Sequence, residues 1–314
     1  MSLQTFQDFA YNSFVTSIQQ QYELFGTATN GAIIMSSDGF SGDYIQRSAI
    51  ENLASQVGNR DVSSTAAATE HAIAELLKSD VKVGWGTPNI SYRNTDFDYT
   101  KRDPRIAGTA FGEAIAQGAM AYQLNSLLGA AVAAIDDADV IYDGTAGVAT
   151  LQSLNSGAAK FGDRQSAIAC WVMHSKSMND IYGQALANSN DLFNFGTVRV
   201  TSDGFGRPLV MTDSDNLHFD NTGTENYHQL GLVSGGLAAL DQGDLRTYQV
   251  TDLDQQNARE LLKAEGTFGV GVKGYTWNTS VVKPTDAELA TAGNWSRVTD
   301  LGHKDTAGVR VTTL

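Results

Sequence analysis

The feature that most constrains the fold is a long stretch of sequence with the pattern of a single helix. Asp103 followed by Pro104 is typical of an N-cap and a first helical position. The chain from there to about 137 contains no further proline and is rich in Ala, Leu, Gln and Met. Its apolar face is marked by Phe111, Ile115, Gly118 and Tyr122 and then, after a shift, by Leu124, Leu128, Ala131 and Ile135. At 1.5 Å per residue, about 30 residues give a helix of roughly 45 Å. We therefore expect a spine over 103–137.

The composition of the chain argues against several classes of protein, including nucleic-acid-binding, secreted and membrane-spanning proteins. The 314 residues can bury one large core or two ordinary ones. The net charge of −14 disfavours tight or sequence-specific nucleic-acid binding, because such binding needs Lys and Arg to neutralise phosphates. The first basic residue is Arg47, so we expect no secretory signal, and no apolar segment approaches the roughly 20 residues that span a bilayer. One cysteine fits a reducing cytoplasm. We expect a soluble, acidic protein made in the cytoplasm.

The N-terminal region, 1–35, has aromatic residues at mostly helical spacing and predicts a helix that ends at Gly26. This stripe consists of Phe6, Phe9, Tyr11, Phe14, Ile18, Tyr22 and Phe25. So much aromatic surface on an arm needs a partner, which is either the body of the fold or a neighbouring subunit.

The region 36–102 mixes short elements. The stretches 43–57 and 65–80 have the composition of short helices, and 81–100 alternates like an extended strand, with Val81, Val83 and Trp85 on one face. The region lacks a dense apolar core of its own. We therefore expect an arm or hairpin rather than an independent domain.

The remainder divides into an α/β segment, 138–265, and a closing segment, 266–314. "SAIACWVMHS" predicts a buried strand, "SKSMNDIYGQALA" a capped amphipathic helix and "RPLVMTDS" a second buried strand. In the closing segment the alternation shifts phase at Gly274, which predicts a bulge. "KPTDAELATAGNW" predicts a capped helical turn and "AGVRVTTL" a terminal strand.

Cys170 and His174 are the first candidates for chemistry, as a thiol nucleophile and its base. On a strand, residues four apart share a face but stand about 13 Å apart at 3.3 Å per residue. That separation is too large for a thiolate–imidazole pair, and cysteine is among the most often buried residue types. We interpret both residues as structural.

Asp213 and Asp215 follow an apolar strand, as the nucleophile and general acid do in haloacid-dehalogenase-like phosphotransferases. That superfamily has Thr or Val two residues after the second Asp, where this chain has Leu217. The alternative is that Asp and Ser begin a turn after a buried strand, and we favour it. The same stretch fails as a calcium loop, because His218 stands where glycine is required.

Other titratable residues give no metal or phosphate motif. The histidines lie at 71, 174, 218, 228 and 303, without an HxH or HxxxH pair, and no glycine stretch forms a phosphate loop. An acidic cluster after the long helix suits a cation, a basic partner or simply solvent; it comprises Asp136, Asp137, Asp139 and Asp143. A basic cluster at the helix start could pair with an acidic neighbour; it comprises Lys101, Arg102 and Arg105. We assign no catalytic, cofactor-binding or metal-binding residue.

The order of these parts resembles the major capsid protein of tailed bacteriophages, which has the Hong Kong 97 coat fold. "AIACWVMHSKSMNDIYGQAL" resembles the family's apolar strand ending in Met-His-Ser or Met-His-Pro before a helix. "FGTVRVTSDGFGRPLVMTDSDNL" resembles its later strand, with Gly-x-Pro, an apolar run and Thr-Asp. "YHQLGLVSGGLAAL" resembles the next segment, and "GTFGVGVKGYTWNTSVVKPTDAELATAGNW" the closing strand and turn. The resemblance spans nearly the whole chain and is most specific from 165 to 300.

The resemblance implies an α+β fold with four parts. These are an N-terminal arm at 1–35, an extended loop at 36–102 that overlaps an adjacent subunit, a peripheral domain with the spine helix at 103–137 and 266–314, and an α/β axial domain at 138–265. Cys170 and His174 then lie on, and just beyond, a core strand of the axial domain. The aromatic residues of the arm are buried against a neighbouring subunit.

The resemblance also implies a structural function and no enzymatic one. Hexamers and pentamers of the chain would form the icosahedral head shell around the double-stranded DNA of a tailed phage (Caudoviricetes), contacting the DNA non-specifically. The chain would be a virion capsid component assembled in the bacterial host cytoplasm, without cofactor or membrane. Because residue 1 has the character of a true start, we expect a separate scaffolding protein, with a portal and a decoration protein as further partners.

Three alternatives remain open from the sequence. Some family members join subunits through a Lys–Asn isopeptide bond, and Lys78 and Lys82 lie in the corresponding loop, but we do not expect this crosslink. An encapsulin-like shell shares the fold and encloses cargo enzymes instead of DNA. A magnesium-dependent phosphotransferase would use Asp213 and Asp215.

Overall fold

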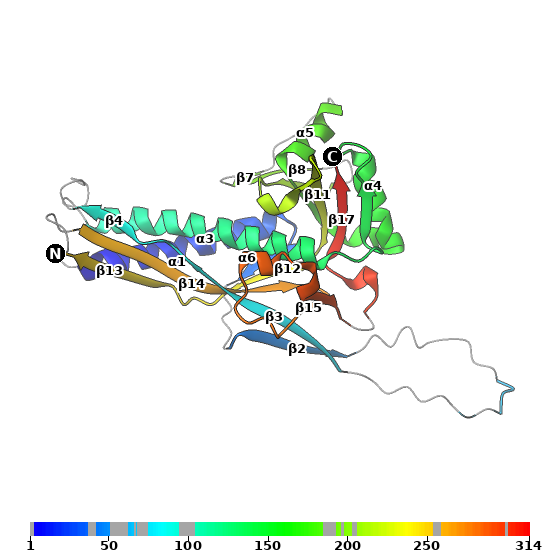
Figure 1. Ribbon diagram of the computed structural model, residues 1–314, viewed down its shortest axis with the longest axis horizontal. Coiled ribbons are helices and arrows are strands. Elements are labelled where there is room, and N and C mark those ends of the chain that lie inside the picture. The colour runs from blue at the N-terminus through cyan, green and yellow to red at the C-terminus, as the bar shows by residue number, and fades with distance from the viewer. Residues whose placement is uncertain are drawn as a thin grey trace.

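Two long helices lie side by side along one sheet, and a second sheet stands at one end of them (Figure 1). This computed structural model confirms the expected α+β class. It describes residues 3–36, 42–50, 62–65, 67, 75–93, 104–184, 193–195, 198–202, 206–253, 259–298 and 301–314.

The expected long helix is α3, Pro104–Ala134, which has 31 residues. Helix α1, Leu3–Ala28, runs beside it in the same direction, since Phe6 packs on Phe111 and Tyr22 meets Gln123. The inner face of α1 is buried within the chain and consists of Phe6, Ala10, Phe14, Ile18, Tyr22 and Phe25. The expectation that a neighbouring subunit buries this stripe is therefore wrong. The chain's own spine covers it, while Phe9 and Tyr11 stay exposed.

The predicted end of α1 at Gly26 is also wrong, because the helix continues to Ala28. Gly26 lies within the last turns, and a Cβ there would meet nothing within 4 Å. The chain turns at Asn30 and Gly31, which both have positive φ, and Gly31 N–H donates to the Gly26 carbonyl at 2.8 Å. A left-handed glycine after the helix is the usual C-terminal signal.

The first sheet lies along α1 and α3. Its strand order is β1 (Ile33–Ser36), β12 (Leu237–Asp241), β14 (Arg259–Val272), β3 (Glu75–Gly86) and β2 (Tyr44–Ile50), and β13 (Arg246–Asp252) and β4 (Ile90–Arg93) also pair with β14. The 14-residue β14 pairs with β13 and β4 along its first half and with β12 and β3 along its second.

The short helices expected in 36–102 are wrong where the structure describes them. Residues 44–50 form β2 and residues 75–80 open β3, and the two strands pair from Tyr44 opposite Val81 to Ile50 opposite Glu75. The rest of both predicted helices falls almost entirely outside the described residues. Helix propensity differs by well under 1 kcal/mol per residue, so the ladder that continues into β14 overrides it.

The second sheet is mixed and carries helices α4 (Leu151–Ala158) and α5 (Ser175–Gln184). Its order is β5 (Ile141–Gly144), β17 (Gly308–Thr313), β11 (Thr224–Val233), β6 (Ile168–Met173), β9 (Pro208–Met211), β8 (Val198–Ser202) and β7 (Phe193–Phe195), with β10 (His218–Asn221) on β11. The predicted buried strands at 166–175 and 207–214 are β6 and β9, and the predicted helix after β6 is α5.

Sheet membership crosses the expected boundary between 265 and 266. The C-terminal strand β17 was assigned with the spine, yet it pairs with β11 and β5 in the second sheet. Conversely, β12 and β13 were assigned to the α/β segment, yet they pair with β14 in the first sheet. The physical reason is the register of β17 with β11. In this register Val309 and Val311 of β17 lie fully buried in the core beside the second sheet.

The expected bulge at Gly274 is a turn. Lys273 and Gly274 separate β14 from β15 (Tyr275–Trp277), which pairs with β16 (Trp295–Arg297) in a small sheet of its own. Gly274 has a φ of +80°. The predicted capped turn is α6 (Asp286–Leu289), where Thr285 and Glu288 form a capping box.

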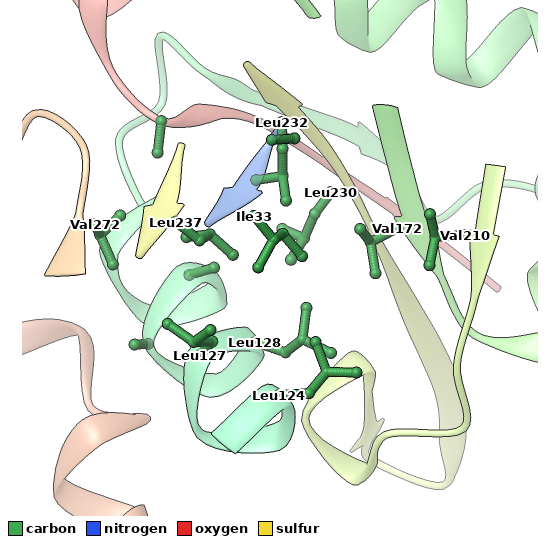
Figure 2. Packing of buried hydrophobic residues seen from close by; sticks show 14 of the residues in the cluster. Ile33, Leu124, Leu127, Leu128, Val172, Val210, Leu230, Leu232, Leu237 and Val272 are labelled. Atoms are coloured by element: carbon green, nitrogen blue, oxygen red, sulfur yellow. The ribbon is translucent and has the colours of Figure 1, made fainter. Parts of the chain in front are cut away.

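Both large sheets share one hydrophobic core, built around the C-terminal half of α3. Figure 2 shows Leu124, Leu127 and Leu128 of α3 pointing into the space between the two sheets. The second sheet contributes Val172, Val210, Leu230 and Leu232, and the first contributes Ile33, Leu237 and Val272. The C-terminal half of α3 therefore packs against both sheets.

Candidate functional site

Cys170 and His174 occupy different structural roles. Cys170 lies within β6 and is completely buried, and burial raises the pKa of its thiol to about 12. His174 follows β6 and caps α5: its Nδ1 accepts from Lys176 N–H at 3.2 Å, and its carbonyl accepts from Met178 N–H at 3.1 Å. The Nδ1 atom is thus bound to the helix backbone, and Nε2 lies 3.6 Å from an Asp213 carboxylate oxygen. The geometry supplies no nucleophile–base pair here.

Asp213 and Asp215 lie where β9 leads into a turn. The Asp213 side chain is 62% exposed; one carboxylate oxygen accepts from Ser175 N–H at 3.3 Å and stands 3.6 Å from His174 Nε2. Asp215 opens a short 3-10 turn capped by the Ser214 hydroxyl. Asp213 is therefore an acidic side chain at the N-terminus of α5, a favourable position beside the helix dipole. The favoured interpretation, a turn after a buried strand, matches this geometry.

The folded chain brings two histidines together that the sequence keeps 44 positions apart. The rings of His174 and His218 lie 5.5 Å apart between centroids, and Tyr227 stands 5.1 Å from His174. Burial lowers the pKa of His174, partly opposed by Asp213. His71 lies outside the described residues. Within the part of the chain that the structure describes, no group of three His, Cys, Asp or Glu side chains could hold a metal ion.

Two residues of the acidic cluster after α3, Asp136 and Asp137, pair with arginines of the same chain. Asp136 pairs with Arg310 of β17 at 2.5 Å, and Asp137 pairs with Arg297 of β16 at 2.6 Å. No local sequence signal reveals these partners, which lie more than 150 residues away. The cluster therefore ties the end of the spine to the last strands.

The basic residues singled out by the sequence are only partly described. Lys101 and Arg102 lie outside the described residues, and Arg105 stands over the Phe9 ring at 5.7 Å. Lys78 pairs with Asp80 at 3.1 Å on β3, while Lys82 faces Gly269 in the ladder. Arg105 therefore joins α3 to α1, while the Lys78–Asp80 pair lies within the single strand β3.

An open groove of about 340 Å³ lies between β3 and α3. Its lining is largely apolar and includes Trp85, Pro88, Ile115 and Tyr122. The Tyr122 hydroxyl donates to Asp286 at 2.9 Å, and burial raises its pKa to about 12, so it is no base near neutral pH.

Two pairs of antiparallel strands lie at the margins of the subunit. The paired strands β2 and β3 lie along the lower edge of the body, and the β13–β14 hairpin lies at one end of the long axis (Figure 1). β13 exposes apolar side chains on its outer face, Tyr248 and Val250, and Leu253 follows it. No described helix combines the length and hydropathy needed to cross a membrane.

A family model described as "Gp13-like: Major capsid protein 13-like" matches residues 2–310. The chain belongs to this family. The resemblance to phage major capsid proteins is thereby confirmed, and the chain is a structural capsid protein. A search of curated proteins finds no match.

Solved phage capsids share the fold of this capsid protein. The capsid of Ralstonia phage GP4 has a TM-score of 0.53 at 11% identity, over 92% of this chain and 88% of that one. The head of Helicobacter pylori bacteriophage KHP40 gives 0.52 at 8% identity, over 91% and 88%. The capsid of cyanophage Pam1 gives 0.51 at 10% identity, over 90% and 88%. At such identities the likeness establishes the fold alone.

Proposed function

We propose that this capsid protein assembles, as hexamers and pentamers, into the icosahedral head shell of a tailed phage and encloses its double-stranded DNA. The observation that carries the proposal is the family match over residues 2–310, together with an α+β fold in which one spine helix joins two sheets. Because the matching family is one of major capsid proteins, we favour a shell that encloses DNA over an encapsulin-like shell that encloses enzymes. Asp213 accepts from Ser175 N–H at the start of α5 and lies beside His174, contacts that give it a structural role, so we propose no enzymatic role.

We propose that the two sheets belong to different domains of the subunit. The second sheet with α4 and α5 forms the axial domain around the five- and six-fold centres, and the first sheet with α1 and α3 forms the peripheral domain. The β2–β3 hairpin overlaps an adjacent subunit. The position of β2 at the edge of the first sheet, with β3 as its sheet neighbour, supports this role (Figure 1).

The acidity of the chain fits a DNA container. A surface rich in Lys and Arg would bind phosphates strongly and oppose DNA release. A net charge of −14 leaves contact with DNA weak and non-specific. The same proposal includes assembly in the host cytoplasm with a separate scaffolding protein, a portal and a decoration protein.

Electron microscopy of the full chain, beside its sedimentation profile, tests the proposal. Closed shells, or rings of five and six, are expected, with a scaffolding protein co-expressed if the chain alone stays unassembled. Asp213→Asn should assemble like the parent chain. A chain that remains monomeric under all these conditions and hydrolyses a phosphate ester with magnesium would overturn the proposal.

A charge reversal tests the role of the hairpin. Arg47 is exposed on β2, so Arg47→Glu should leave the subunit folded but reduce assembly. Lys160→Glu, exposed beyond α4, is the matched reversal and should assemble normally. Equal assembly of both variants would argue against hairpin overlap while leaving the shell function intact.

A further inference from the structure

The first turn of α5 is held by acceptors that lie just before it in the chain and beside it in the fold. The N–H groups of a first helical turn have no acceptor within the helix itself. Ser175 N–H donates to the Asp213 carboxylate at 3.3 Å. Lys176 N–H donates to His174 Nδ1 at 3.2 Å, and Met178 N–H donates to the His174 carbonyl at 3.1 Å. His174 therefore supplies two of these three acceptors, and one of the two is on a titratable ring.

The contact with Lys176 determines which ring nitrogen of His174 carries the hydrogen. A backbone N–H can only donate, so Nδ1 is the unprotonated acceptor and the hydrogen of the neutral ring lies on Nε2. That hydrogen lies on the side of Asp213, whose Oδ1 stands 3.6 Å from Nε2. A ring turned by 180° would present a C–H to Lys176 and leave this N–H without an acceptor. Both contacts therefore select the same ring orientation and the same tautomer.

A second proton on the ring has to bind Nδ1, the nitrogen that already accepts a hydrogen bond. The new Nδ1–H would face Lys176 N–H, so two donors would oppose each other and the hydrogen bond would be lost. The positive charge would also lie at the N-terminus of a ten-residue helix, where the helix dipole opposes a cation. The Asp213 carboxylate beside Nε2 attracts the charged ring and holds it in place. Protonation therefore removes this cap while the side chain stays at the helix end.

The charged and titratable groups around the ring act in both directions. Burial is the largest influence and lowers the pKa of His174, and the carboxylate of Asp213 opposes this effect. The His218 ring, 5.5 Å away between centroids, lowers this pKa further. Lys176 is paired with Asp180 at 2.6 Å. The facing groups come from α5, the turn after β9, β10 and β11, and they are Lys176, Asp213, Asp215, His218, Glu225 and Tyr227.

We propose that His174 is an acid-sensitive cap, which holds the first turn of α5 while its ring is neutral and releases that turn when Nδ1 takes up a proton. Ser175 and Met178 keep their own acceptors. Gln229 of β11 remains hydrogen-bonded to the Ser177 side chain at 2.9 Å, so the change is confined to the first turn. The device lies within one subunit and does not rest on the proposed shell.

The direction of the pH dependence follows from the lowered pKa. The folded state takes up the His174 proton less readily than the unfolded state, in which a histidine has a pKa of about 6.5. The contribution of the cap to stability is therefore complete above pH 6.5 and is lost as pH falls through the lowered pKa of the folded state. The loss of protection is about tenfold for a pKa that folding lowers by one unit.

Hydrogen exchange of the unassembled full chain, with exchange times scaled for the intrinsic effect of pH, measures the first turn of α5. Peptides that cover 175–184 should lose protection severalfold between pH 8 and pH 5, with β6 peptides as the internal reference. In His174→Asn the side-chain oxygen is as many bonds from the backbone as Nδ1 and cannot titrate, so protection should stay high at both pH values. His174→Ala lacks the acceptor and should show low protection at both.

Three further measurements separate the cap from a general effect of acid. His303→Gln, outside this cluster, should leave the pH dependence of α5 unchanged. Asp213→Asn can still accept from Ser175 but no longer attracts the charged ring, so the loss of protection should move to lower pH. NMR of ring-15N-labelled histidines at pH 8 should show the Nε2–H tautomer for the signal that His174→Asn removes. An Nδ1–H tautomer, pH-independent protection in the parent chain, or an undiminished pH dependence in His174→Asn would overturn the proposal.

Discussion

Gly112 of α3 lies directly against Ala10 of α1, so closely that a Cβ on Gly112 would collide with the Ala10 carbonyl oxygen. One turn earlier, a Cβ on Gly108 would stand 2.6 Å from the Phe6 carbonyl oxygen. Both obstacles are backbone atoms, which cannot rotate away as a side chain does. The two helices therefore approach each other through positions that lack side chains.

Gly112→Ala should accordingly destabilise the chain, although alanine favours helices. The added methyl group forces α1 away from α3, and overpacking of this kind reduces the free energy of unfolding by about 1–3 kcal/mol. Urea denaturation of the unassembled chain measures this loss. Hydrogen exchange should locate it in α1.

Gly118→Ala is the matched control, because it lies on the same helix and a Cβ there meets nothing within 4 Å. Relief of the glycine penalty should raise the free energy of unfolding by about 0.5–1 kcal/mol. Opposite signs for the two substitutions are the expected outcome. Stabilisation by both would mean that α1 does not pack on α3 as described.

Arg310 should be more important to stability than the surface ion pairs. Its guanidinium donates to the Val132 carbonyl and to Asp136, each at 2.5 Å, and so joins β17 to the end of α3. The Arg310 side chain is mostly buried, so Arg310→Met leaves a carbonyl oxygen and a carboxylate without their donor. We expect a loss of roughly 1–3 kcal/mol in urea denaturation.

Lys304→Ala provides the comparison. Lys304 pairs with Asp163 at 2.5 Å, but Asp163 is largely exposed, and exposed pairs contribute about 0–1 kcal/mol. Arg310→Lys should recover only part of the loss, since an ammonium group cannot reach both acceptors in the fork geometry of arginine. Equal effects at 304 and 310 would contradict the bridging role of Arg310.

Much of the fold could be predicted from local patterns. The Asp-Pro start and the proline-free run predicted α3, whose first helical residue is Pro104, and the apolar runs around Cys170 and Val210 predicted β6 and β9. These signals are complete within a short window of sequence. The resemblance to phage capsid proteins rested on the order of such windows, and the family match confirms it.

What the sequence did not predict depends on pairing between distant segments. Residues 44–50 have no strongly alternating pattern and become β2 only because 75–81 pairs with them. The assignment of β17 to the second sheet depends on its register with β11, some 80 positions earlier. The meeting of Tyr22 with Asp241 and the pairs of Asp136 and Asp137 with arginines likewise require the folded chain. The division of the chain into domains stays a prediction, and the proposed division by sheets replaces the boundary at 265.

His228 should make the chain sensitive to acid. Burial lowers its pKa to about 3, and its Nδ1 lies 3.1 Å from the Thr312 hydroxyl while its ring stacks on Phe219. The unfolded state takes up a proton near pH 6.5, whereas the folded state resists it. The stabilisation is therefore complete above pH 6.5 and is lost as pH falls towards 3, by an amount on the order of a few kcal/mol.

Urea denaturation from pH 7 to pH 4 tests this dependence. His228→Gln cannot take up the proton, so its stability should fall less steeply with acid than that of the parent chain, even if it is lower at pH 7. His303→Gln, at a less buried position, should follow the parent slope. Parallel slopes for the parent and His228→Gln would remove His228 as the cause.

The thiol of Cys170 should be inert in the folded chain. It is completely buried in β6, and burial raises its pKa to about 12, so both access and the thiolate form are suppressed. An aromatic disulfide reagent should label it only after urea unfolds the protein.

Cys170→Ala should reduce stability by roughly 0.5–1.5 kcal/mol, as for one deleted methyl group, and Cys170→Ser by about 1–3 kcal/mol, because a hydroxyl would lose its water. Labelling of the native chain at the rate of an exposed thiol would mean that Cys170 is reactive. Stability that decreases from the parent chain to Cys170→Ala and then to Cys170→Ser would support its assignment to the core.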